Sequence, residues 1–590
     1  MAQIRKKPKQ PPVNIDKFYG VNLDPDGETG LKLGEASYMK NFKVTSNYNL
    51  KKRPGQTNVI SGFNKPIRGM WYGKIKGLYH FLFACNSHIY KHNLINDTNT
   101  SIGNLTDDIT TFFAYNDKLY ILDGHEYYSW DGTTFKVVEG YMPTLTISSK
   151  PTGGGELLEQ KNLLTDWVKQ SFSGDGSTKK FKLLEDNIQS DMVKAVVDGV
   201  NKVENTDFTV NRSTGEVTFN AAPSALPNNT IITFKMKATS DREQIKKCKY
   251  AMFYGGSNDT RVHLWGNSNL PNRRIYSDLE NGQPSAEYFP INGYTEIGSS
   301  QYTITDIVLQ YDRQLIFTNS GTYYSYYTTI NKKASFPVFP LNTSIGNKPF
   351  KSVQVIQNNP VSVYDGVYEW ISTNIRDERN ANHISNRIQS ALNDLDLAKA
   401  ITFDYEKESE YWLCVGSVVY IWNYRNDTWY VYDNIPALNF LTINGILHFA
   451  TNDGRIVKFD NSKRNDNGVS INCIWEMGFC DFGHETMTKY MSKAWVSIKP
   501  ASRTSAYVEW RTDKATSRND TRFYYSLATF IHANFAHWSF NTNYNPQPIP
   551  KKMKAKKFIY FKLIVKNNTS DELLTLLSIN LKTRLGSESK

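Results

Sequence analysis

The chain has 590 residues, of which 39% are hydrophobic, and a net charge of +12 from 69 Lys and Arg against 57 Asp and Glu. This length predicts roughly three to four domains, and the longest uncharged runs are interrupted by Asn, His and Pro, which argues against the ~18 mainly apolar residues that cross a bilayer. The charge excess is compatible with a polyanionic partner but does not demand one. Because aromatic residues are frequent (36 Tyr, 31 Phe and 12 Trp), we expect an all-β fold.

Residues 1–17 are basic and rich in proline, and we interpret them as a flexible arm. No apolar run follows them, so they do not have the pattern of a secretory signal peptide. Arg5, Lys6 and Lys7 could contact DNA phosphates or a neighbouring subunit, since Lys and Arg neutralise phosphate without reading sequence.

Residues 18–60 are predicted to be an N-terminal segment that contacts a C-terminal platform or a neighbouring subunit. Within it, alternation places Met39 and Phe42 as core anchors and Leu50 at the end of a strand. The dipeptide at 54–55, Pro54 and Gly55, is then expected to form a turn that leads into the first β repeat.

Lys51, Lys52 and Arg53 form a compact basic cluster before that turn. One interpretation is a contact with DNA phosphates, but short basic clusters on a slightly basic protein are usually solvated. We favour a structural junction between domains or subunits. Arg53 is expected to form a fixed salt bridge there, because its planar guanidinium is preorganised for a carboxylate.

Two parts of the chain, 61–150 and 241–470, repeat one pattern: a short apolar strand, a turn with Gly, Asn or Asp, and a second strand rich in Tyr and Trp. Its instances are 79–92, 118–132, 261–278, 313–327, 360–373, 410–433 and 445–460. The aromatic residues expected to face inward after the turns are Tyr90, Trp130, Tyr323, Trp370 and Phe459. Hairpins that recur at roughly 40 to 50 residues are typical of a β-propeller, and the alternative is one large irregular β-sandwich.

Three segments depart from this pattern. Residues 151–240 have short alternating strands after a Gly-rich linker, which predicts a small inserted β-sandwich. One short helix is expected within 381–400, where Ser385 can cap it and Ile388 and Leu392 share a face. Residues 471–590 have longer alternating strands and are predicted to form a C-terminal β-domain, the platform.

Motifs for metal binding, catalysis or cofactor binding are weak throughout the sequence. Cys473, Cys480 and His484 lack the fourth ligand and the tight Cys pair of a structural zinc site, so we expect no metal there. The five scattered cysteines give no disulfide framework and favour a reducing cytoplasm. The acidic stretches 24–30 and 460–468 fail as calcium loops and are interpreted as surface turns. No nucleophile motif or selected carboxylate pair appears, so we expect neither catalysis nor a cofactor.

The segment "FYGVNLDPDGETGLKLGEASYMKNFKVTSNYNLKKRPG" (18–55) resembles the amino-terminal signature of phage tail hub proteins, also described as nozzle, tail tubular or packaged-DNA stabilisation proteins of short-tailed phages. The residues that carry the resemblance are Gly20, Asn22, Gly34, Glu35, Met39, Asn41, Phe42, Leu50, Arg53, Pro54 and Gly55. The order of repeats, insert and terminal domain also agrees with this family.

The resemblance implies a structural protein of the virion tail or neck that assembles in the bacterial host cytoplasm. It implies a ring, commonly of six copies, that joins portal and adaptor proteins to distal tail parts or fibres and conducts and retains genomic DNA without sequence specificity. On this view Met39, Asn41, Phe42, Arg53, Pro54 and Gly55 belong to an assembly joint, and Arg5, Lys6, Lys7, Lys51 and Lys52 face DNA or a neighbouring subunit. The alternatives are a glycan- or receptor-binding propeller of a tail fibre and a host-envelope glycosidase.

Overall fold

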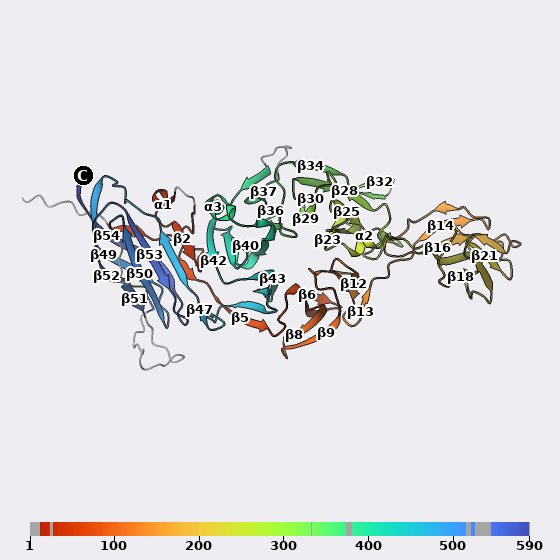
Figure 1. Cartoon of the computed structure of the whole chain (residues 1–590), viewed down its shortest axis with the longest axis horizontal. Coiled ribbons are helices and arrows are strands. Elements are labelled where there is room, and N and C mark those ends of the chain that lie inside the picture. The colour runs from red at the N-terminus through yellow and green to blue at the C-terminus, as the bar shows by residue number, and fades with distance from the viewer. Residues whose placement is uncertain are drawn as a thin grey trace, which may run out of the picture. The chain divides into compact units, whose positions relative to one another are not determined.

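The computed structural model describes residues 12–23, 27–331, 333–372, 380–514, 521–525 and 544–588, so Arg5, Lys6 and Lys7 lie outside the described residues. The fold is all-β, and nearly all strand pairs are antiparallel (Figure 1). The chain divides into two compact units. Of the described residues, unit 1 holds those up to 67 and those from 348 onward, and unit 2 holds those from 68 to 347.

Unit 2 contains four antiparallel sheets of four strands each within its described residues. The first is β6 (Ile67–Ile75), β7 (Leu78–Cys85), β8 (His88–Asn93) and β9 (Thr98–Asn104); the second is β10 (Thr111–Tyr115), β11 (Lys118–Leu122), β12 (Tyr127–Trp130) and β13 (Phe135–Val137). The third is β23 (Tyr250–Gly256), β24 (Asp259–Trp265), β25 (Arg273–Tyr276) and β28 (Tyr294–Glu296); the fourth is β29 (Ile304–Gln310), β30 (Arg313–Thr318), β31 (Thr322–Tyr326) and β34 (Val338–Asn342). The short helix α2 (Glu243–Lys246) precedes the third sheet.

Two further sheets in unit 2 form a small β-sandwich around a core of its own, which includes Phe172, Phe181 and Phe219. One sheet has the order β15 (Glu156–Leu157), β14 (Thr144–Ser149), β16 (Trp167–Phe172), β22 (Thr230–Lys235), β18 (Lys194–Val197) and β19 (Val200–Lys202), and the other β17 (Lys180–Lys182), β21 (Glu216–Phe219) and β20 (Phe208–Asn211). The sandwich begins at Thr144, so the expected linker after residue 150 is already inside it: Glu159 accepts a hydrogen bond from the Thr144 amide at 2.6 Å.

Unit 1 contains three more sheets of the same hairpin pattern. The first is β35 (Gln354–Ile356), β36 (Asn359–Val363), β37 (Val367–Trp370) and β38 (Ala381–His383); the second is β39 (Ile401–Tyr405), β40 (Glu410–Val415), β41 (Val418–Asn423) and β42 (Thr428–Tyr432). The third is β43 (Ala437–Ile443), β44 (Ile446–Thr451), β45 (Ile456–Asp460) and β5 (Gly55–Ile60), with β46 (Asn465–Asp466) and β47 (Val469–Ser470) added to β5. All seven predicted hairpins are confirmed.

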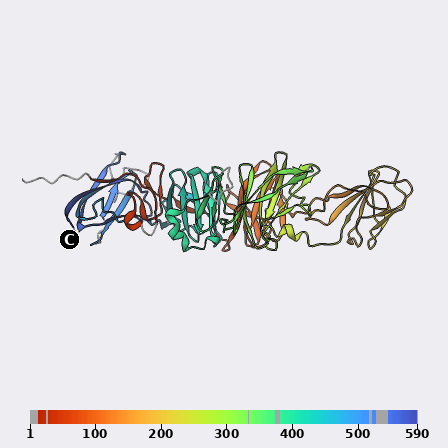
Figure 2. The same cartoon turned by 90° about the horizontal axis from the view of Figure 1, so that it is seen from above.

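The two C-terminal sheets of unit 1 incorporate the N-terminal segment. One has β3 (Phe42–Val44), β4 (Leu50–Lys52), β54 (Thr575–Glu588), β49 (Met487–Ile498) and β52 (Pro548–Phe558), with β1 (Val13–Ile15) paired to β54. The other has β2 (Ala36–Lys40), β48 (Cys473–Met477), β53 (Phe561–Asn567), β50 (Thr504–Thr512) and β51 (Thr521–Tyr525). In Figures 1 and 2 the red N-terminal strands therefore lie among the blue C-terminal ones. The short helix α1 (Gly27–Gly30) precedes β2.

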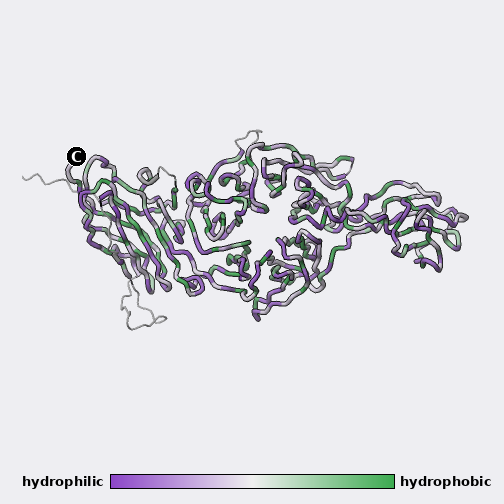
Figure 3. Tube along the Cα trace, viewed as in Figure 1, coloured by the Kyte–Doolittle hydropathy of each residue, from purple (hydrophilic) through white to green (hydrophobic). Residues whose placement is uncertain are grey.

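Turn chemistry and burial explain why these hairpins form. The turn between β10 and β11 consists of Asn116 and Asp117, both with positive φ, as a two-residue hairpin turn requires. Central strands such as β41 are buried on both faces, whereas the outer strand β9 is mostly exposed, and hydrophobic and hydrophilic residues are interspersed along the trace (Figure 3). Of the aromatic residues expected to face inward, Trp130, Trp370 and Phe459 are buried, while Tyr90 and Tyr323 are half-buried.

The expected helix within 381–400 is shorter than the sequence pattern predicts. Only α3 (Gln389–Asn393) is α-helical, and it is flanked by short 3₁₀ turns at 386–388 and 397–399. Residues 381–383 instead form β38, because they complete the sheet on β37. The Ser385 hydroxyl accepts a hydrogen bond from the Val367 amide at 2.9 Å and does not cap the turn that follows it.

Candidate functional site

The residues predicted for a structural joint meet at a buried guanidinium in unit 1. The Arg53 side chain is fully buried, and its two terminal nitrogens contact the two carboxylate oxygens of Asp466 at 2.9 and 2.6 Å. Its remaining donors bind the Asn41 side chain at 2.9 Å and the carbonyls of Pro54 and Asp433 at 3.1 and 3.2 Å. Each of the five N–H donors thus has an acceptor. The expected fixed salt bridge of Arg53 is confirmed, and its partner belongs to the same chain.

Asn41 is the residue at which the chain passes from one C-terminal sheet to the other. It lies between β2 and β3, which belong to different sheets, and it has a φ of 57°. Asn tolerates this left-handed conformation better than most residues. Its side-chain NH₂ donates to Asp433 at 2.6 Å and to the Asn472 carbonyl at 2.8 Å, while its oxygen accepts from Arg53 and from the Asp433 amide. Asn41 and Arg53 therefore form one satisfied network.

Met39 and Phe42 flank this crossing and are buried, as expected of core anchors. Leu50 is also buried, but it begins β4 and does not end a strand, because residues 45–49 form the turn between β3 and β4. The strand after Pro54 also differs from expectation. Gly55 begins β5, which pairs with β45 through Gly55 and Asp460 and so completes the last hairpin sheet, not the first.

The backbone around Gly55 leaves no room for a side chain. A Cβ atom at this position would lie 2.2 Å from the Asn465 carbonyl oxygen. The Gly55 amide donates to the Lys463 carbonyl at 3.1 Å, which holds β5 against the segment that carries Asp466. Glycine is therefore required here by close backbone approach, with no positive φ involved.

Lys52 is buried in the interior of unit 1. Its ammonium donates to the Asn567 side chain at 2.9 Å and to the Thr569 carbonyl at 2.8 Å, so it ties β4 to the end of β53. Asn567 in turn donates to Glu572 at 3.2 Å. Burial lowers the pKa of Lys52. The prediction that Lys52 contacts DNA or a neighbouring subunit is therefore wrong, since its charge is used inside the chain.

Lys51 points to the other face of β4, into a cavity of about 420 Å³ in unit 1. On the same wall, Lys43 forms ion pairs with Glu408 at 2.7 Å and with the buried Glu410 at 3.2 Å. Arg53 and Pro54 also contribute to the lining. The basic cluster of the sequence thus divides: Lys52 and Arg53 act in the interior, and Lys51 remains at a hollow.

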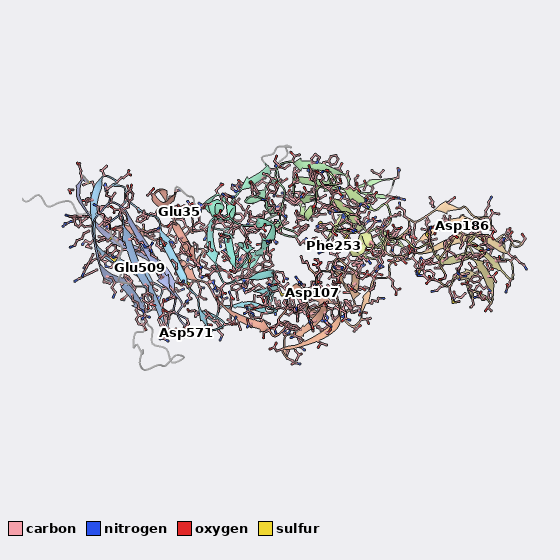
Figure 4. All side chains as sticks on the ribbon, viewed as in Figure 1. Glu35, Asp107, Asp186, Phe253, Glu509 and Asp571 are labelled. Carbon is pink, nitrogen blue, oxygen red and sulfur yellow. The ribbon has the colours of Figure 1, made fainter. Side chains whose placement is uncertain are left out.

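The partners of this site were not predicted. Asp466 lies in the stretch 460–468 that was interpreted as a surface turn, and this interpretation is wrong for Asp466, which is buried against Arg53. Asp460 does have a turn role, because its carboxylate accepts from the Ser462 amide at 2.8 Å. In the stretch 24–30, residues 24–26 lie outside the described residues. Glu35, labelled in Figure 4, accepts a hydrogen bond from the Lys32 amide at 3.1 Å.

Two further buried side chains have structural roles. Cys473 is buried in β48 and donates to the Asn41 carbonyl, and Asp123 accepts from the amides of His125 and Glu126 in a turn. Among the described residues, no group of three or more His, Cys, Asp or Glu side chains could hold a metal ion. In the same part of the chain, no helix is long and apolar enough to span a membrane.

Comparison with known proteins adds little to this description. No protein-family model matches the chain, and no curated protein does. Solved structures with a likeness include the WD40 domain of Neurospora crassa Pan2 (9% identity, TM-score 0.31, 70% of this chain and 96% of that one). Others are the computationally designed Ika8 protein (8%, 0.30, 68% and 99%) and an exo-beta-1,3-galactanase from Phanerochaete chrysosporium (8%, 0.17, 81% and 96%). TM-scores this low carry no argument, so the fold rests on the strand pairing above.

Proposed function

We propose that this protein is a structural component of a bacteriophage tail or neck, a hub or nozzle. In this role it forms an oligomeric ring, with six copies as the expected number, that conducts and retains genomic DNA. The ring connects portal and adaptor proteins to distal tail parts or fibres. The protein is not an enzyme in this proposal, and it resides in the virion.

The observation that carries the proposal is where the residues of the family-like segment, 18–55, lie in the structure. Asn41 and Arg53, which belong to the quoted signature, lie in one buried network with Asp433 and Asp466. Gly55 of the same signature donates to the Lys463 carbonyl, close to Asp466 in the sequence. A chance likeness would not be expected to select the residues on which the joint depends. The network links the N-terminal segment, the last hairpin sheet and a C-terminal sheet, which supports a platform built from both ends of the chain.

The finer architecture is part of the same proposal. The seven hairpin sheets are blades of one β-propeller, and the sandwich of β14 to β22 is inserted between blades. The last blade combines β43 to β45 with β5 from the N-terminal segment. Pairing β5 from the N-terminal segment with β45 covers an edge that the hairpin would otherwise leave unpaired.

Negative-stain images and the mass of the purified full chain test this function. The expected result is a ring of several copies with a bore wide enough for duplex DNA. Asp466→Asn should weaken the joint and reduce the fraction of rings, whereas the control Asp453→Asn, at an exposed pair with Arg455, should leave it unchanged. A protein that stays monomeric at all concentrations contradicts the proposal.

One observation favours a second candidate, a glycan- or receptor-binding propeller. An open hollow of about 660 Å³ in unit 2 is lined by Phe253 (Figure 4), Tyr311 and Tyr326, whose side chains are 36%, 59% and 38% exposed. Aromatic faces with adjacent Asp312 and Arg313 could hold a sugar ring by stacking and hydrogen bonds. Tyr311→Ala should then abolish polysaccharide binding, while Tyr79→Ala, at a similarly exposed tyrosine outside the hollow, should not. Absence of binding to host-envelope polysaccharide removes this candidate.

A further inference from the structure

The cavity beside Lys51 carries an unbalanced charge. Its lining includes seven cationic side chains and three carboxylates. The cations are Lys43, Lys51, Lys52, Arg53, Lys407, Lys458 and Arg464, and the carboxylates are Glu408, Glu410 and Asp460. All belong to unit 1 and come from β3, β4, the hairpin sheets and the segment after β45. A half-enclosed space with this excess of positive charge is favourable for an anion.

The carboxylates of the cavity are already engaged. Glu410 is buried and contacts Lys43 at 3.2 Å, the Trp412 indole N–H at 3.0 Å and the Tyr430 hydroxyl at 2.6 Å. Glu408 contacts Lys43 at 2.7 Å, so one lysine serves both acids. Asp460 accepts hydrogen bonds from the Ser462 amide and hydroxyl at 2.8 and 2.6 Å. Among the described residues, these acids form ion pairs only with Lys43. Glu408 acts on Lys51, and Asp460 on Lys458 and Arg464, only as charges beyond ion-pair distance.

Three cations are left without a carboxylate partner. Among the described residues, no carboxylate lies within ion-pair distance of Lys51, Lys458 or Arg464. The Arg464 guanidinium donates from one terminal nitrogen to the carbonyls of Asn461 and Lys463, so its other donors remain available. By contrast, Lys52 and Arg53 have their partners in the interior, and Lys407 donates to the Gly445 carbonyl at 3.0 Å.

Burial and neighbouring positive charges disfavour the charged form of Lys51. Burial lowers the pKa of Lys51, the nearby charges of Lys43, Arg464 and Lys499 lower it further, and the charge of Glu408 acts in the opposite direction. Burial also lowers the pKa of Arg464, against the opposing effect of the Asp460 charge. Like charges held together in a partly desolvated hollow repel each other, and an anion placed among them relieves that repulsion.

We infer that this cavity binds a phosphate-type oxyanion, with Arg464, Lys51 and Lys458 as its ligands. The guanidinium of Arg464 is suited to a bidentate contact with two oxygens, and the two ammonium groups add charge without a directional requirement. The volume accommodates an anion of the size of pyrophosphate, or one phosphate of a longer chain. The inference depends on the side chains of unit 1 and stands whether or not the protein forms a ring.

Isothermal titration of the full-length protein with sodium pyrophosphate, with buffer ionic strength held constant, tests the site. We expect saturable binding with one site per chain. Arg464→Gln should raise Kd about 10-fold or more, because it removes charge-assisted hydrogen bonds. Lys458→Gln should raise Kd in the same direction. The control Lys399→Gln removes an exposed lysine of unit 1 that pairs with Asp396 outside the cavity, and it should leave Kd unchanged.

Two results would overturn the inference: no binding of pyrophosphate at millimolar concentration, or binding that Arg464→Gln and Lys458→Gln leave intact. Thermal unfolding of each variant establishes that the fold is retained, which is expected because Arg464 contacts only backbone carbonyls. A second titration with a short DNA duplex identifies the source of the phosphate. A duplex that competes with pyrophosphate and loses affinity in Arg464→Gln assigns the site to a DNA backbone, and a duplex that does not compete assigns it to a free anion.

Discussion

Two buried arginines, one in each unit, differ in how their positive charge is compensated. Arg53 in unit 1 has a carboxylate, two carbonyls and an amide oxygen for its five donors. Arg274 in unit 2 is equally buried, but no carboxylate contacts it among the described residues. It donates to Gln314, to Thr295 at 3.3 Å and to the Phe336 carbonyl at 3.0 Å, and its Nε has no partner. Burial lowers the pKa of Arg274 to about 10.

This difference indicates how much each buried guanidinium contributes to the stability of its unit. A buried cation with a bidentate carboxylate fixes the relative position of two segments, because either group alone would be left uncompensated in the interior. A buried cation held only by neutral acceptors contributes little net stability, since its desolvation is poorly offset. We therefore expect unit 1 to depend on Arg53 and unit 2 to tolerate the loss of Arg274.

The largest effect is expected from Asp466→Asn. The substitution keeps the shape of the side chain but leaves the Arg53 charge uncompensated, so the free energy of unfolding should fall by about 3–5 kcal/mol. Urea denaturation of the full chain measures the change, and hydrogen exchange should place the loss of protection in peptides of unit 1. A loss below about 1 kcal/mol would mean that the pair is not what holds the joint.

A smaller loss is expected from Gly55→Ala. The added methyl group would overlap the Asn465 carbonyl oxygen, and the backbone shift that relieves the overlap should cost about 1–3 kcal/mol. The matched control is Gly30→Ala, because nothing lies within 4 Å of the position its Cβ would take. Equal stability of the two variants in urea denaturation would contradict the close approach at Gly55.

Replacement of each arginine by methionine tests the comparison directly. Arg53→Met leaves the Asp466 carboxylate buried without its partner, so the free energy of unfolding should fall by as much as in Asp466→Asn. Arg274→Met removes a buried charge together with a few neutral hydrogen bonds, and because these terms oppose each other the net change should be about 1 kcal/mol or less. The same urea denaturation applies to both variants, and similar losses in both would remove the distinction between the two sites.

The smallest effect is a pH dependence in unit 2. His263 is buried beside Arg274, and burial together with the Arg274 charge holds its pKa well below the usual range. The folded state therefore does not take up the proton that the unfolded state binds below about pH 6.5, so stability is present above that pH and declines as the pH falls. His263→Gln should reduce the slope of stability between pH 7 and pH 5, as hydrogen exchange of β24 and β25 can measure. An unchanged slope would show that His263 is protonated in the folded state.

Local patterns predicted the hairpins well. Each of the seven predicted segments contains its turn residues and both strands, so its pairing requires only neighbouring residues, as in 118–132. The core positions of Met39 and Phe42 followed from alternation for the same reason. The salt bridge of Arg53 was expected from the chemistry of its guanidinium, because a planar fork is suited to a carboxylate.

Long-range partners could not be predicted in the same way. Nothing near Arg53 indicates that Asp466, more than 400 positions away, is its partner. Lys52 belongs to a basic cluster, and such clusters are usually exposed to solvent. The one indication that its side chain points inward is strand alternation on β4, where Lys51 between Leu50 and Lys52 is half-buried. The helix within 381–400 was overestimated because the pairing of β38 with β37, a tertiary contact, overrode a local helical pattern. Propensity is a weak guide where a neighbouring strand supplies hydrogen bonds.

The pairing of β1 and β4 with β54 also determines when these strands can pair during synthesis of the chain. Residues 13–15 and 50–51 take their partners from 575–581, which are synthesised roughly 500 residues later. At typical elongation rates of about 5–20 residues per second, these strands wait on the order of a minute with open edges. Over that interval the nascent chain exposes strands that another polypeptide could pair with. Binding of a chaperone to these strands would protect them until β54 has been synthesised.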